Sequence, residues 1–175
     1  MWMKTKKFKK GYYLSEMHIL RVILVLGVVL ASYPHWNYPY PLHVDEWFHI
    51  AEGKMVAQGA GINWYSGQKF GLGMERAWHV TLGLVQKVLG LNVKEWMIFP
   101  AVMHAFAILS VFYFVKKMFG SREALVASFL TALMPSNVTM GGPVMLVPVN
   151  LSLIFIPLGL VFLFGLAFKN DWWNS

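Results

Sequence analysis

The stretch Ala124–Phe168 reads ALVASFLTALMPSNVTMGGPVMLVPVNLSLIFIPLGLVFLFGLAF, and none of its residues is Asp, Glu, Lys, Arg or His. One membrane crossing takes about 20 residues, so a charge-free run of 45 residues is too long for a single crossing. We therefore expect a hairpin of two spans. Its turn region is marked by Pro135, Gly141, Gly142, Pro143 and Pro148.

The composition of the whole chain agrees with a membrane protein. Of its 175 residues, 57% are hydrophobic and only 13% are charged, whereas about a quarter of the residues of a soluble domain are charged. The net charge of +7 does not indicate nucleic-acid binding, because the basic residues cluster beside apolar runs and no base-reading module is present. The absence of cysteine excludes disulfides and Cys-based metal sites.

Two further apolar runs and the positions of the basic residues predict the topology. The N-terminal lysines and the Lys116–Lys117 pair each flank an apolar run, as residues on the cytoplasmic side do. We predict an all-α integral membrane protein of about four spans, with a cytoplasmic N-terminus and one large outer loop. The segments are a basic tail (1–13), span one (14–33), the outer loop (34–94), span two (95–115), a cytoplasmic loop (116–123), a short span three with the hairpin tip (124–143), span four (144–168) and a cytoplasmic tail (169–175).

The outer loop is predicted to contain two short amphipathic helices. The first begins near Asp45 and runs to Gln58, where Gly59 and Gly61 follow it. The second runs over 75–89 and places Trp78, Leu82, Val85 and Leu89 on one face. Helices of this kind lie on membrane surfaces.

The first of these helices opens with the residues that point to chemistry, His43-Val44-Asp45-Glu46-Trp47-Phe48-His49. Asp45 and His49 are four residues apart and share a helix face, and Glu52 follows one turn later. A carboxylate at this position suits a general base for an acceptor hydroxyl, or a ligand for a divalent metal ion that holds a phosphate. A purely structural role is equally compatible with the spacing, with Asp45 capping the helix and its neighbours solvated.

The order of these features resembles the GT-C class of membrane glycosyltransferases, which includes oligosaccharyltransferase catalytic subunits, protein O-mannosyltransferases and lipid A aminoarabinose transferases. The similarity lies in the basic tail, the first span and the Asp45-Glu46 pair that opens the outer loop. The segment 121–127, which leads into a short third span ending at Pro135, is also similar to this class.

The resemblance implies an inverting transfer of a sugar from a polyprenyl- or dolichyl-phosphate donor to an acceptor at the outer membrane face. Asp45 and Glu46 would be the catalytic residues, with Asp45 as the base or as a ligand of Mg²⁺ or Mn²⁺, and His49 would bind substrate. We also infer a phosphate contact from Lys69 or Arg76, since cationic side chains suit that partner. His79 fits a plain surface residue equally well.

The chain departs from that class in two ways. GT-C enzymes have more than four spans, so this chain would be the N-terminal part of an enzyme, or another membrane subunit would supply further helices. The segment 135–149 also lacks an acidic residue, which favours a mechanism with Asp45 alone, or a partner chain that supplies the missing groups.

Two other functions remain open. One is a non-catalytic scaffold or accessory subunit. The other is a membrane metalloprotease, because Asp45-Glu46-x-x-His49 differs by one residue from the His-Glu-x-x-His zinc motif. His104, inside the second span, is either a site residue or a buried histidine bonded to a neighbouring helix.

Overall fold

The computed structural model describes residues 10–59, 72–135 and 142–167, with the side chains of 10–14, 72–76 and 167 left out of the description. Every regular element in these ranges is a helix. The helices are α1 (Lys10–Asn37), α2 (Val44–Ala57), α3 (Leu72–Leu89), α4 (Val93–Trp96), α5 (Phe99–Met118), α6 (Ser121–Ala132) and α7 (Val149–Ala167). The prediction of an all-helical chain is thus confirmed for the described residues.

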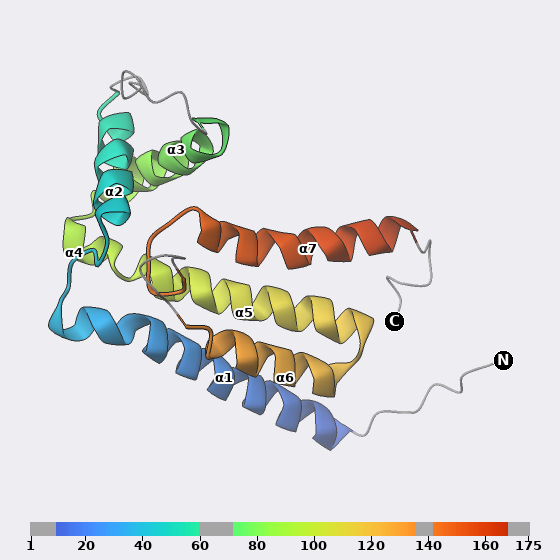
Figure 1. Cartoon of the computed structure of the whole chain (residues 1–175). Helices are drawn as coiled ribbons and strands as arrows, with labels where there is room; N and C mark the ends of the chain where they lie inside the picture. The colour runs from blue at the N-terminus through green and yellow to red at the C-terminus, as the bar shows by residue number, and fades with distance from the viewer. Residues whose placement is uncertain (1–9, 60–71, 136–141, 168–175) are drawn as a thin grey trace.

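Four of the helices, α1, α5, α6 and α7, run side by side as a bundle in which successive helices alternate in direction (Figure 1). Helix α5 packs against the other three, and α1 also packs against α6. The pair α2–α3 projects from the end of the bundle where α1 ends and α5 begins (Figure 1).

Three helical segments within the described residues are long and apolar enough to cross a membrane. They are Ser15–Asn37, Val93–Met118 and Val149–Leu166. Helix α6, in the region of the predicted short third span, has 12 residues and is therefore about 18 Å long, against a hydrocarbon core of about 30 Å. The described residues thus contain three helices suited to membrane spans, which supports the predicted membrane character, where about four spans were predicted.

Helix α1 extends further than the predicted span 14–33. Pro34 lies inside its last turn instead of ending it. Proline removes one backbone hydrogen bond from the helix, but the next residue, His35, connects this turn to another part of the chain. His35 Nε2 lies 3.1 Å from the carbonyl oxygen of Val144, in the segment that precedes α7.

A single stripe of α1 faces the other helices. Its members recur every three or four residues, as expected for one helix face, and are Glu16, Leu20, Ile23, Gly27, Ala31 and His35. A methyl group at Gly27 would overlap Ile108 Cδ1 of α5. The missing side chain therefore lets α1 and α5 approach closely, as small residues do between membrane helices.

The α2–α3 pair is attached to the bundle by a hydrophobic cluster at that end. The α2–α3 pair contributes Ile50, Trp78 and Leu82 to this cluster. The rest of the chain contributes Trp96 and Met97 at the end of α4, Met103 of α5 and Leu146 before α7. Trp96 is fully buried, and its Nε1 donates a hydrogen bond to Gln86 Oε1 at 3.0 Å. The outer pair is therefore seated on the bundle through apolar contacts.

Basic residues gather at one end of the bundle beside Glu16 and Glu123, and both acidic and basic residues lie on α2, α3 and α4 at the other end. Lys116 and Lys117 lie in the last turn of α5, and Arg122 lies in the first turn of α6. Both turns are at the end away from α2–α3 (Figure 1). Asp45, Glu46 and Glu52 lie at the other end, on α2. A cytoplasmic position for the basic end stays a prediction from the charge rule.

Candidate functional site

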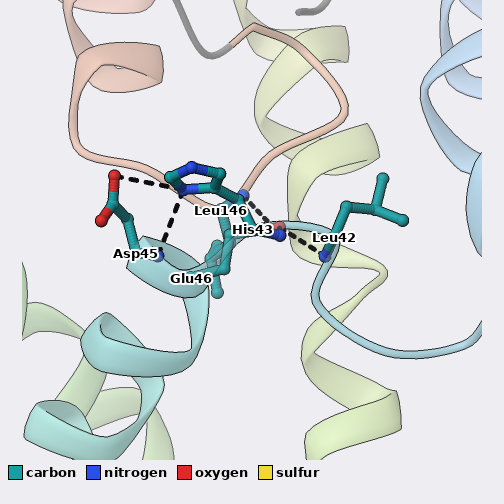
Figure 2. A network of polar contacts seen from close by, with 5 residues as sticks. All are labelled: Leu42, His43, Asp45, Glu46 and Leu146. Carbon is teal, nitrogen blue, oxygen red and sulfur yellow. Dashed lines mark hydrogen bonds and ion pairs between the residues drawn. The ribbon is translucent and has the colours of Figure 1, made fainter. Parts of the chain in front are cut away.

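The start of α2 is held by its own side chains. His43 is the N-cap residue, with extended backbone angles, and its Nδ1 accepts a hydrogen bond from the Asp45 backbone N–H at 3.2 Å. Glu46, three residues later, accepts the His43 backbone N–H at 3.0 Å and that of Leu42 at 2.7 Å on its Oε2 (Figure 2). This exchange satisfies backbone donors that the first turn of a helix leaves unpaired.

Glu46 also connects α2 to a distant part of the chain. Its second oxygen, Oε1, accepts the backbone N–H of Leu146 at 2.7 Å, and the side chain is fully buried (Figure 2). Three backbone donors therefore surround one carboxylate, and hydrogen bonds to a charged acceptor are the strong kind. We assign Glu46 a positioning role, because these contacts fix the start of α2 against the segment that leads into α7.

Asp45 points away from this buried network. Its side chain is 63% exposed, and its Oδ2 lies 3.2 Å from His43 Nδ1. That nitrogen faces both the Asp45 N–H and the Asp45 carboxylate (Figure 2). A neutral Nδ1 accepts from the N–H, whereas a protonated Nδ1 donates to the carboxylate. The His43 ring therefore contacts both the backbone and the side chain of Asp45.

His49 lies on the next turn of α2, but it is buried. Its Nδ1 is 2.9 Å from His79 Nε2 of α3, and both side chains are about 5% exposed. Burial and the neighbouring His79 lower the pKa of His49 to about 4, although the Asp45 carboxylate acts in the opposite direction. His49 is therefore neutral at neutral pH, and its contact with His79 joins α2 to α3.

The predicted site residues are only partly brought together. Asp45 is exposed, whereas Glu46 and His49 are engaged with other parts of the protein. Lys69 lies outside the described residues, as does the side chain of Arg76. Their predicted phosphate contacts remain predictions.

The described side chains do not assemble a metal site. No group of three or more His, Cys, Asp or Glu residues suited to a metal ion occurs among them, and the Glu46 carboxylate is taken by backbone donors. These residues do not fit a divalent metal, so no chemical step is derived through one. The zinc interpretation of Asp45-Glu46-x-x-His49 likewise finds no ligand set here.

Three contacts of this region were not visible in the sequence. The partner of His49 is His79, which the sequence suggested as a surface residue, and the partners of Glu46 and His35 are backbone atoms of Leu146 and Val144. Apolar neighbours at regular spacing around Trp78 and Leu82 indicate that His79 flanks a buried face, whereas no sequence pattern reports a backbone partner.

His104 takes the structural alternative that the sequence left open. It is buried in α5, and its Nε2 lies 3.5 Å from the carbonyl oxygen of Ala132 in α6. Contact with a neighbouring helix is thus confirmed for this residue.

Comparisons of the chain with protein families, with curated proteins and with solved structures find no match.

Proposed function

We propose that the chain forms the membrane region of a glycosyltransferase, as the whole enzyme or its N-terminal part, which uses a sugar carried on a polyprenyl phosphate. The observation that carries the proposal is the position of Asp45. It is the exposed carboxylate in the first turn of a helix that begins seven residues after the first span ends. Donor headgroups that stay anchored in the bilayer are held near that level.

The surroundings of Asp45 suit a general base. The carboxylate reaches solvent, while its backbone is fixed by the His43 cap and by the buried Glu46 contacts behind it. A base must be positioned within hydrogen-bond distance of the proton it removes. Three backbone contacts of Glu46 supply that rigidity without using the reactive group.

The proposed step needs no group beyond donor, acceptor and base. Asp45 takes the proton of an acceptor hydroxyl as the acceptor oxygen bonds to the anomeric carbon, on the face opposite the phosphate. The bond between that carbon and the phosphate oxygen breaks, and the polyprenyl phosphate leaves with the bonding electron pair. The configuration at the anomeric carbon is inverted.

An accessory subunit is the second candidate. It is favoured by the engagement of Glu46 and His49 in contacts within the chain, which leaves Asp45 as the exposed member of the predicted catalytic set. Such a subunit would present α2 and α3 to a partner membrane chain that carries the remaining catalytic groups.

Native mass spectrometry of the protein released from its own membrane tests the proposal. We expect a bound polyprenyl phosphate and its sugar conjugate, with Asp45→Asn raising the proportion of the sugar conjugate because the donor is no longer consumed. The control is Glu95→Gln, which changes another exposed acid of a helix first turn. A bound membrane chain without lipid supports the accessory subunit, and the absence of both, with identical spectra for Asp45→Asn, contradicts the transferase.

A further inference from the structure

Helix α3 has one face that nothing in the described structure covers. Its opposite face, with Trp78, His79, Leu82 and Gly83, is buried, and α3 packs against α2. The uncovered face carries Val80, Leu84 and Val88 at intervals of four residues, which places them in one row along the helix. They are 36%, 59% and 79% exposed, so exposure of hydrocarbon increases toward the end of the helix.

The polar groups on this side are arranged as an apolar medium requires. Thr81 lies beside the row, and its Oγ1 donates a 2.7 Å hydrogen bond to the carbonyl oxygen of Ala77 one turn earlier. The hydroxyl hydrogen therefore needs no water, and unpaired donors are what a bilayer penalises most. Lys87 is in the last turn, where its long side chain can extend to headgroups.

The position of α3 in the chain identifies the medium. The helix ends at Leu89, and the membrane-spanning segment Val93–Met118 begins four residues later. Ile98, in the first turns of that span, is 63% exposed, as expected for a side chain that faces lipid. The Val80–Leu84–Val88 row is therefore only a few residues along the chain from a side chain that faces lipid. Both lie at the end of the bundle from which α2–α3 projects sideways (Figure 1).

We propose that the Val80–Leu84–Val88 face of α3 is a lipid-binding face, which lies in the interfacial region of the outer leaflet. Amphipathic helices in this setting bury their apolar side about 5–10 Å below the headgroups. The α2–α3 pair is then held against the membrane at two points, the spans and the α3 face. This inference does not depend on sugar transfer, since an accessory subunit would need the same support.

The chain contains no cysteine, which allows single nitroxide labels without background. We would label Leu84→Cys and Val88→Cys in lipid nanodiscs that hold one chain each, with Gln58→Cys as the control. Gln58 is exposed at the end of α2, away from the spans. Collision rates with oxygen, which concentrates in lipid, and with a water-soluble nickel chelate report the depth of each label.

We expect oxygen collisions to exceed nickel collisions at positions 84 and 88, and the reverse at position 58. Nickel collisions at 84 and 88 equal to those at 58 would place the face in water and overturn the proposal. Low collision rates with both reagents would mean that protein covers the face, which also overturns it. In that case, spectra are recorded in liposomes with and without dilution by unlabelled chain. Line broadening that disappears on dilution identifies a second copy of the chain as the covering protein. All three substitutions are at exposed positions, and circular dichroism checks that the helices are retained.

Discussion

In the bundle, side chains donate to backbone carbonyls of neighbouring helices, as Ser110 Oγ of α5 does to Ile154 of α7 at 2.5 Å. At the start of α2, backbone N–H groups donate to a side chain, the Glu46 carboxylate. The physical cause is the supply of free groups. Inside a membrane helix every N–H is already paired, and only the second lone pair of a carbonyl is left. At a helix start and in a loop the N–H groups are free and require an acceptor.

The difference shows where this protein tolerates charge. A buried carboxylate is stable only when donors or a cation compensate it, and free backbone N–H donors occur at helix starts and in loops. The bundle holds its buried carboxylate, Glu16 of α1, through an ion pair with Lys116 of α5, and elsewhere it uses hydroxyl groups and a histidine. The comparison predicts that loss of a polar contact in the α2–α3 region lowers the free energy of unfolding more than a packing substitution in the bundle does.

The largest loss of stability is expected for Glu46→Ala. The change leaves the N–H groups of Leu42, His43 and Leu146 without their acceptor, at an expected cost of about 3 kcal/mol in the free energy of unfolding. The measurement is reversible unfolding in mixed micelles. Glu95→Ala is the matched control, because Glu95 also accepts an N-cap N–H, from Asn92, but is exposed. We expect a loss of about 0.5–1 kcal/mol there. Equal losses for the two variants would show that the buried contacts of Glu46 add nothing.

An intermediate effect is expected where helices touch through glycine. A methyl group at Gly83 would lie 2.7 Å from Val56 Cβ and 3.1 Å from the carbonyl oxygen of Gly53, so α2 and α3 must separate. We expect Gly83→Ala to cost about 1–3 kcal/mol. Gly27→Ala in the bundle should cost less, since the close atom there is Cδ1 at the end of the flexible Ile108 side chain.

Gly159 of α7 provides the control for these two variants. No atom lies within 4 Å of a methyl group added there, so Gly159→Ala should keep or raise stability by up to about 1 kcal/mol through helix propensity. Unfolding of the three variants under one condition gives the order. A greater cost for Gly27→Ala than for Gly83→Ala would reverse the comparison between the two regions.

The smallest change in the free energy of unfolding is expected when the pH is lowered slightly from neutral. The pKa of His49 is about 4 in the folded chain and 6.5 in an unperturbed histidine, so the unfolded chain binds the proton first. The contribution of neutral His49 to stability is complete above pH 6.5 and is lost progressively as the pH falls toward 4. Unfolding between pH 7 and 5.5 samples the upper part of this range. The slope should be smaller in His49→Gln, and an unchanged slope would assign the titration to another group.

Several features of the outer loop follow from local rules. The first helix was predicted over 45–58 and is observed as Val44–Ala57, followed by Gly59 with a φ of +77°. Glycine adopts that angle without strain, which is why the end of the helix was predictable. The apolar spacing also predicted the α3 face of Trp78, Leu82, Val85 and Leu89: the first two are buried and Val85 is partly buried, whereas Leu89, the last residue of the helix, is 58% exposed. In contrast, the helix cap was assigned to Asp45 as one option, and the structure gives the N-cap position to His43.

The sequence by itself predicted a helical membrane protein, because an uncharged run of 45 residues is suited to a bilayer, and the three long apolar helices support that prediction. It also predicted a helix that begins near Asp45, and α2 begins at Val44. Only the tertiary structure separated the roles of neighbouring residues, with Asp45 exposed, Glu46 bound to Leu146 and His49 bound to His79. These partners are 100 and 30 residues away along the chain, and periodicity reports which face a residue occupies, not which distant atom meets it.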